Sequence, residues 1–288
     1  MNKLMIFADG TCDLPKDFVK KHNIQIIGLR YSIGDSEGWF TTATQKQLDD
    51  FYTRMRRGEE AHTSLVLYDD AVKEFEPFFK QGYDIIHFGL SSGLAKTWEN
   101  ANNAGNDLAK KYGRKFYAPD TRTVSAANMI FINKILELQA KYKDDENGFD
   151  KIVANFPATY EKMNVYFTVE DLKYLKKSGR LSGAAAFIGG MLSIKPIIQI
   201  DDAGKLVTMT KKTGRLQSIQ FLASLVTKIN PDHPEVFIIH ADCPDDAKLL
   251  EQKICENFIG AKTSIINMGF IITTHTGPGV VGFGFIGN

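Results

Sequence analysis

In the first half of the chain, short apolar runs typical of β-strands alternate with longer segments whose apolar residues recur at helical spacing. Because crossover helices join parallel strands, this pattern predicts a mostly parallel sheet with helices on both faces. Ligands of such sheets bind beyond the carboxyl ends of the strands. The expected strands are residues 4–8, 24–31, 84–90 and 115–118. One helix is expected to begin at Pro15 and another after Ser125, and three more are expected to include Leu48–Met55, Val72–Phe79 and Leu94–Tyr112.

The second half follows a different pattern. Two apolar segments, Ile197–Ile200 and Leu206–Thr210, flank the turn residues Asp201–Gly204, and this arrangement predicts a β-hairpin. Further strands are expected at Val236–His240 and near the C-terminus. Antiparallel pairing of this kind indicates an α+β domain.

A polar, charged segment, Lys141–Asn147, separates the two patterns. A length of 288 residues is enough for two ordinary domains. We therefore expect an α/β fold of two domains: an N-terminal, mostly parallel α/β/α sandwich at residues 1–160 and a C-terminal α+β domain at residues 161–288.

Composition excludes several classes of protein. The 35 basic side chains nearly balance the 34 acidic ones, so no broad positive surface is expected to bind nucleic acid. No run approaches the roughly 18 apolar residues of a membrane helix, and the apolar start is too short for a signal peptide. The three cysteines, Cys12, Cys243 and Cys255, lack metal-ligand spacing. We expect no zinc site and a location in the reducing cytoplasm.

Gly89-Leu90-Ser91-Ser92-Gly93 matches the G-x-S-x-G nucleophile elbow between a strand and a helix. With Asp242 or Asp245 and then His275, it gives the Ser, Asp, His order of a serine hydrolase. The chain has no HGGG-type oxyanion segment upstream. The serines could equally cap the following helix or supply a hydroxyl that binds a ligand. Three interpretations therefore stay open here: nucleophile, helix cap and ligand-binding hydroxyl.

Small hydroxyls and one imidazole recur at loop positions, in Thr63-Ser64, Ser91-Ser92 and Thr274-His275-Thr276. Taken singly, each suits a turn, a cap or a structural histidine. Together they are donors suited to a carboxylate held away from water, because a buried carboxylate without such partners is costly.

Two short basic clusters lie in the second half, one at Lys176–Arg180 and one at Lys211–Arg215. They fit a solvated basic surface, or a docking patch for an acidic or phosphate-carrying partner that uses Arg180, Lys212 and Arg215. The chain has no G-x-x-x-x-G-K-[ST] loop to hold ATP.

Several motifs in fixed order make the whole chain similar to the DegV family. They are Asp9-Gly10-Thr11-Cys12-Asp13-Leu14-Pro15, Thr63-Ser64, Ser91-Ser92-Gly93-Leu94 with Thr97, Asp120-Thr121-Arg122-Thr123-Val124-Ser125, Gly179-Arg180-Leu181-Ser182 with Ile194-Lys195-Pro196, and His275-Thr276-Gly277-Pro278-Gly279.

The resemblance implies that a long-chain fatty acid lies in a buried lipid tunnel between the two domains, with no other cofactor and no metal. It implies that this subunit presents the carboxylate to a separate ATP-dependent fatty acid kinase, which makes the acyl phosphate. The implied carboxylate ligands are Thr63, Ser91, Ser92 and His275, and the implied ligand-adjacent residues are Ser64, Gly93, Thr276 and Gly277.

Overall fold

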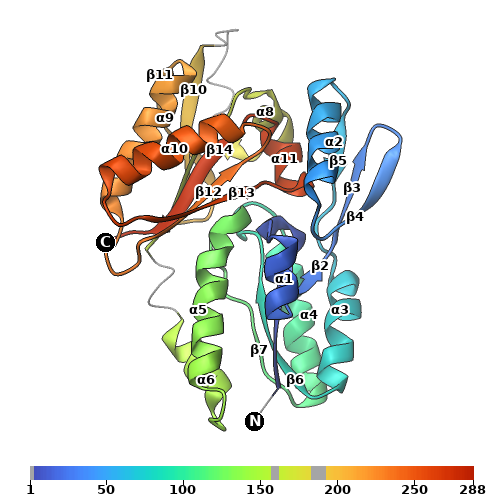
Figure 1. The fold of residues 1–288 in the computed structure, drawn as a ribbon. Helices are drawn as coiled ribbons and strands as arrows, with labels where there is room; N and C mark the ends of the chain where they lie inside the picture. Colours follow the sequence, from blue (N-terminus) through green and yellow to red (C-terminus); the bar gives the residue numbers. More distant parts are fainter. Residues whose placement is uncertain (1–2, 157–161, 183–192) are drawn as a thin grey trace.

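The N-terminal domain is built on a four-stranded sheet in the order β2-β1-β6-β7, in which all neighbouring strands run parallel. The computed structural model describes residues 3–156, 162–182 and 193–288. In Figure 1, helices α5 and α6 lie on one side of this sheet and α3 and α4 on the other, which confirms the expected α/β/α arrangement. The strands are β1 (Lys3–Asp9), β2 (Gln25–Ile27), β6 (Tyr83–Phe88) and β7 (Phe116–Tyr117), and the helices are η1 (Gly10–Cys12), α1 (Lys16–His22), α3 (Tyr68–Lys80), α4 (Thr97–Tyr112), η2 (Ser125–Ala127), α5 (Asn128–Lys141) and α6 (Gly148–Asn155).

The prediction of one strand over residues 24–31 is wrong, because the chain changes sheets at Gly28. Strand β2 joins the parallel sheet, whereas β3 (Leu29–Ile33) pairs with β4 (Ser36–Phe40) and β5 (Ala61–Thr63) in a separate antiparallel sheet. Helix α2 (Gln45–Arg56) lies between β4 and β5 in the chain, and its capping box joins Thr44 and Gln47. An apolar run indicates a strand but not the sheet that the strand joins.

The C-terminal domain has a seven-stranded mixed sheet in the order β13-β12-β14-β8-β10-β11-β9. The expected hairpin is confirmed, since β10 and β11 pair antiparallel around a turn in which Gly204 has a φ of +73°. The expected domain boundary near residue 160 lies outside the described residues. The strands are β8 (Met163–Thr168), β9 (Leu181–Ser182), β10 (Ile194–Ile200), β11 (Leu206–Thr213), β12 (Glu235–His240), β13 (Lys262–Asn267) and β14 (Val281–Ile286), and the helices are α8 (Lys173–Ser178), α9 (Arg215–Ser224), η4 (Leu225–Lys228), α10 (Pro244–Asn257) and α11 (Phe270–Thr276).

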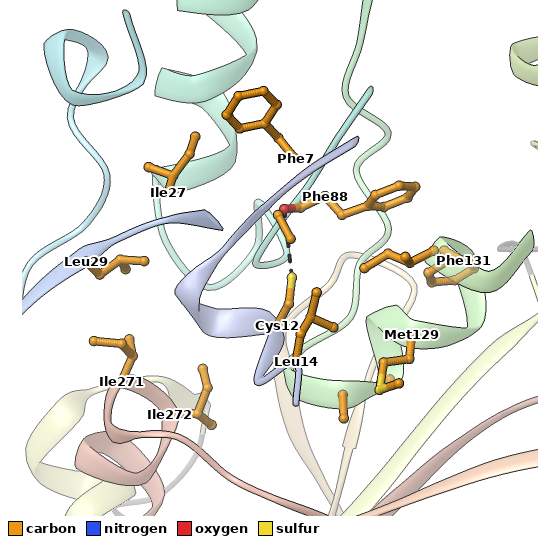
Figure 2. Packing of buried hydrophobic residues seen from close by; sticks show 14 of the residues in the cluster. Phe7, Cys12, Leu14, Ile27, Leu29, Phe88, Met129, Phe131, Ile271 and Ile272 are labelled. Atoms are coloured by element: carbon orange, nitrogen blue, oxygen red, sulfur yellow. Dashed lines mark hydrogen bonds between the residues drawn. The ribbon is translucent and has the colours of Figure 1, made fainter. Parts of the chain in front are cut away.

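One apolar core cluster extends across both domains, and a second lies within the C-terminal domain. Figure 2 shows Ile271 and Ile272 of α11, from the C-terminal domain, next to the N-terminal segment that carries Cys12 and Leu14. The Cys12 thiol donates to the carbonyl oxygen of Phe88 at 3.8 Å, deep in this core. Continuous packing across the junction holds the domains in one arrangement. Within the described part of the chain, no helix combines the length and apolar character needed to cross a membrane.

His87 is a buried polar residue inside the N-terminal domain. Its side chain is fully enclosed, it packs against the Phe75 ring, and neither ring nitrogen has a hydrogen-bond partner among the described residues. Burial lowers the pKa of His87 to about 3, because a charged imidazolium would lose its hydration there. The folded protein therefore holds His87 neutral.

Replacing His87 with Leu is expected to reduce the loss of stability in acid. Between pH 6.5 and about 3, the unfolded parent chain takes up a proton on His87 that the folded chain does not, so the parent loses up to about 1.4 kcal/mol per pH unit. Urea unfolding of the parent and His87→Leu at pH 7, 6, 5 and 4 measures this. The difference in unfolding free energy should move in favour of the variant as pH falls. A constant difference would contradict the assignment.

Candidate functional site

A cavity of about 320 Å³ lies between the two domains. Its N-terminal wall includes residues that follow the carboxyl ends of the parallel strands: Thr11 after β1, Leu29 after β2, Leu90 after β6 and Ser125 after β7. Parallel strands point their carboxyl ends to one edge, so four separate segments of the chain meet here. This is the edge where the sheet topology predicts a ligand.

The opposite wall of the cavity comes from the C-terminal domain and is mainly apolar. Cavities with such walls favour an apolar ligand, because its burial removes hydrocarbon surface from water. The apolar lining residues of this domain are Val165, Phe167, Leu175, Leu206, Ile239, Met268, Ile271, Ile272, Val280 and Phe283.

Thr63 and His275 meet at this cavity, although 212 positions separate them in the chain. Thr63 ends β5, His275 lies in the last turn of α11, and Thr63 Oγ1 is 2.8 Å from His275 Nε2. Burial, together with the positive charge of Arg180, lowers the pKa of His275 to about 4. The imidazole is therefore neutral at pH 7, with a proton on one of its two nitrogens.

Helix α11 is fixed at its start by the N-terminal domain. The backbone N–H of Gly269 donates to Asp13 Oδ1 at 2.9 Å, and the Ser125 hydroxyl donates to the other oxygen of the same carboxylate. Burial raises the pKa of Asp13 to about 7, against the lowering effect of these two hydrogen bonds. One side chain thus links α11, which carries His275, to Ser125, which lines the cavity.

An aromatic cluster packs against the same helix. Phe270 of α11 stacks on Phe51 with ring centroids 4.2 Å apart, and Tyr31 and Phe40 pack against it at 4.9 and 4.7 Å. These three partners belong to α2 and the three-stranded sheet that ends at Thr63. The cluster therefore holds the element carrying Thr63 against the element carrying His275.

Gly277 ends α11, and it is not among the residues that line the cavity. Its φ is +81°, and a Cβ at this position would lie 2.2 Å from the Tyr174 ring. Glycine is required here by the left-handed conformation and by the close approach to Tyr174. Thr276 does line the cavity, and its hydroxyl donates to the Ile272 carbonyl at 3.1 Å. Ser64 lines the cavity as well.

Ser91 and Ser92 do not line this cavity. The Ser91 hydroxyl is buried and donates to the Gly204 carbonyl at 2.8 Å, while the Ser92 hydroxyl donates to Asp120. A Cβ at Gly93 would lie 2.5 Å from the Ala203 carbonyl oxygen, so glycine lets the β10–β11 turn approach. This loop is a contact between the domains.

The serine-hydrolase geometry is not assembled. Ser91 donates to a carbonyl oxygen instead of an imidazole, and His275 Nε2 contacts Thr63. The Asp242 carboxylate accepts from Arg56, which also pairs with Glu170 at 3.3 Å. Nucleophilic catalysis needs a base within hydrogen-bond reach of the hydroxyl.

The three basic residues singled out in the sequence have different surroundings. Arg180 lines both the cavity and the surface groove next to it, and it is exposed. Lys212 Nζ lies 3.9 Å from the centre of the Phe221 ring. Arg215 is tied to Asp246 at 2.8 Å and to the Gly279 carbonyl at 2.7 Å. The sequence alone gave no signal that Arg180 lies beside His275.

The two-domain fold thus has a largely apolar cavity between its domains, with Thr63, His275 and Arg180 on its wall. Residues 3–288 match the model of a family described as uncharacterised protein, DegV family. A DegV domain-containing protein of Clostridium perfringens is 33% identical, covering 100% of this chain and 99% of that protein. The chain belongs to the DegV family.

Solved structures of relatives have the same fold. A fatty acid binding DegV family protein of Streptococcus agalactiae superposes with a TM-score of 0.84 at 26% identity, over 100% of both chains. A DegV lipid binding protein of Thermotoga maritima gives a TM-score of 0.80 at 26% identity, over 98% of this chain and 97% of that chain.

Replacing Arg215 with Ala is expected to destabilise the protein by about 1–3 kcal/mol, because the Gly279 carbonyl and the Asp246 carboxylate lose a charged donor. Lys211→Ala is the matched control in the same basic cluster, because Lys211 is exposed, and it should cost under about 0.5 kcal/mol. Urea unfolding of both variants and the parent measures the difference. Equal stability of the two variants would show that Arg215 does not hold the turn after α11.

Proposed function

We propose that this chain binds one long-chain fatty acid in the cavity between its domains, with the carboxylate at the Thr63–His275 end. The observation that carries the proposal is the composition of the cavity wall: apolar side chains from both domains, with Thr63, His275 and Arg180 together at one place. The relatives described as fatty acid binding and lipid binding share the fold over nearly their whole length, which supports the same ligand class here.

The apolar wall can supply the affinity. Burial of an acyl chain gains about 0.8 kcal/mol per CH₂ group, so a chain of roughly 16 carbons gains on the order of 10 kcal/mol before the cost of ordering it. The cavity volume of about 320 Å³ falls within the range of small-molecule sites. The contacts to the carboxylate then mainly fix the orientation of the fatty acid in the cavity, and the acyl chain supplies most of the affinity.

The neutral imidazole of His275 leaves Thr63 free to serve the ligand. When Nε2 carries the proton, it donates to Thr63 Oγ1, and the Thr63 hydroxyl proton is then available to a carboxylate oxygen. Arg180 adds a positive charge on the same side. In this arrangement two groups position the head group and one offsets its charge.

A polar surface groove of about 530 Å³ adjoins the cavity and shares Thr63, Arg180 and His275 with it. A carboxylate at these residues is accessible to a second molecule from the groove side. We infer that a separate ATP-dependent kinase reaches the carboxylate here and transfers the phosphoryl group, since the present chain has no phosphate-binding loop of its own. Lys212 is retained as a docking candidate, whereas Arg215 is engaged inside the domain.

Replacing His275 with Ala or Thr63 with Val is expected to weaken fatty acid binding by about 5- to 150-fold, equivalent to about 1–3 kcal/mol, because the carboxylate loses either the Thr63 donor or the imidazole that orients the Thr63 hydroxyl towards it. Ser92→Ala is the control, since Ser92 contacts Asp120 and lies outside the cavity wall. Titration with a fluorescent fatty acid gives the affinities, and native mass spectrometry of the purified protein identifies the ligand. Unchanged affinity in both site variants would overturn the head-group assignment.

Replacing Arg180 with Ala is expected to lower ATP-dependent acyl phosphate formation by the partner kinase at least about tenfold, because phosphoryl transfer places negative charge beside this guanidinium. Lys176→Ala is the control from helix α8, because Lys176 lines neither the cavity nor the groove. The measurement is the initial rate at saturating fatty acid. Equal rates for the Arg180 variant and the parent would remove Arg180 from this role.

A further inference from the structure

The carboxyl group of Asp13 is a buried acidic group that bridges the two domains. Asp13 follows η1 in the N-terminal domain and is 6% exposed. Its Oδ1 accepts from the Gly269 N–H, at the start of α11, and its other oxygen accepts from the Ser125 hydroxyl. A Cβ at Gly269 would lie 2.5 Å from Oδ1 and 2.4 Å from the Phe40 ring, so the two domains are in close contact here. A movement of α11 away from the N-terminal domain therefore breaks the contact to Asp13.

Asp13 is connected to the ligand cavity on one side and to a surface groove on the other. Its partner Ser125 lines the cavity, and so does α11. Asp13 and Gly269 themselves line a polar groove of about 490 Å³, together with the exposed residues Lys16 and Gln45. Protons reach the carboxyl group from the groove, and a displacement of α11 changes the cavity wall.

The surroundings of Asp13 do not favour a negative charge. The titratable and charged groups around it are Asp9 of β1, Cys12 of η1 and Tyr52 of α2 in the interior, and Lys16 and Asp17 on the groove. The contacts from α11 and η2 are the Gly269 N–H and the Ser125 hydroxyl, which do not titrate. Burial, together with the charge of Asp9, raises the pKa of Asp13 to about 7.

The neutral acid keeps both contacts across the junction. Oδ1 still accepts from the Gly269 N–H, and the acid hydroxyl on the other oxygen donates to Ser125 Oγ. Both hydrogen bonds are then made without a buried charge.

We propose that Asp13 is a proton-sensitive latch: the neutral acid holds α11 on the N-terminal domain, and loss of the proton favours a state in which α11 moves away and the cavity opens. The ionised form favours this open state because opening returns the carboxylate to water. A negative Asp13 also repels the carboxylate of a fatty acid in the cavity, so both effects favour release of the ligand. The release step rests on the proposed fatty acid binding, whereas the latch itself does not.

The pH range of the latch follows from the difference between the two states. In the open state Asp13 is hydrated and has its ordinary pKa of about 3.9, whereas in the closed state its pKa is about 7. The closed state therefore binds the proton more tightly. The ratio of open to closed molecules should rise by up to about tenfold per pH unit between about pH 4 and pH 7, and level off above that range.

The first test needs no ligand. Two-dimensional amide NMR follows the Gly269 signal and the hydrogen exchange of the α11 amides from pH 5 to 8, in the parent and in Asp13→Asn. In the parent, the Gly269 signal should shift with a midpoint near pH 7, and the protection of α11, corrected for the intrinsic exchange rate, should fall at least about tenfold between pH 5 and 7. Asp13→Asn should show neither change, because the amide gives Gly269 a neutral oxygen and Ser125 a donor at every pH.

Two outcomes of this test would overturn the proposal. A Gly269 midpoint below pH 5 would mean that Asp13 stays ionised in the closed state. Constant protection of α11 in the parent, or the same loss in Asp13→Asn, would mean that the Asp13 proton does not hold the helix. If Asp13→Asn does not fold, the parent titration still decides.

The second test measures release of the fluorescent fatty acid cis-parinaric acid by stopped flow at pH 5.5, 6.5, 7.5 and 8. The ratio of the parent rate to the Asp13→Asn rate cancels the titration of the ligand, and it should rise at least about fivefold over this range. Asp9→Asn is the matched control, since Asp9 is hydrogen-bonded to Thr11 and Leu90 and not to α11. It should keep the pH dependence with a midpoint at lower pH, because a like charge next to Asp13 is removed.

A constant ratio of the two release rates would overturn the coupling between the latch and the ligand. Absence of any binding of cis-parinaric acid would contradict the proposed function instead, and the ligand-free titration of Gly269 would then decide on the latch.

Discussion

Helix α11 is the element on which the arrangement of the domains and the site depends. Its first turn is held by the Asp13 carboxylate, Phe270 is held by the aromatic cluster, and its last turn carries His275. These contacts come from several separate segments of the N-terminal half. A change that loosens α11 therefore alters the cavity wall and the Thr63–His275 contact at the same time, because Ile271, Ile272, His275 and Thr276 of this helix all line the cavity.

The cavity follows from the way in which the two sheets bury their apolar faces. The parallel sheet presents its carboxyl edge to the C-terminal domain, and loop residues at such an edge cannot fill space as regularly as side chains packed within a layer. Apolar residues of the second sheet close the remaining space without filling it. On the cavity wall, the polar side chains of Thr63 and His275 are partners of each other.

Part of the site was predictable from residue types and spacing. The alternation of strands and helices predicted the parallel sheet and the ligand edge. Residue chemistry grouped Thr63-Ser64, Ser91-Ser92 and Thr274–Thr276 as possible donors, and of these the structure brings Thr63 and His275 into contact. The small sheet that brings Thr63 to His275 was not predicted, because the apolar run of residues 24–31 gives no signal of the change of sheet at Gly28. The contacts of Arg215 inside the domain were missed for a similar reason. The residue types of a basic cluster do not indicate whether a side chain faces solvent or donates to a carbonyl group.

The sequence by itself determined the alternation of strands and helices, the positions of most of them and the supply of hydroxyl and imidazole donors, because these depend on local periodicity and residue chemistry. Only the tertiary structure decided which donors meet. It joined Thr63 to His275, placed Arg180 beside them, and engaged Ser91 with Gly204 at the domain contact. The physical reason is that these residues lie far apart in the chain, 212 positions for Thr63 and His275 and 113 for Ser91 and Gly204, and only packing between distant segments fixes such distances.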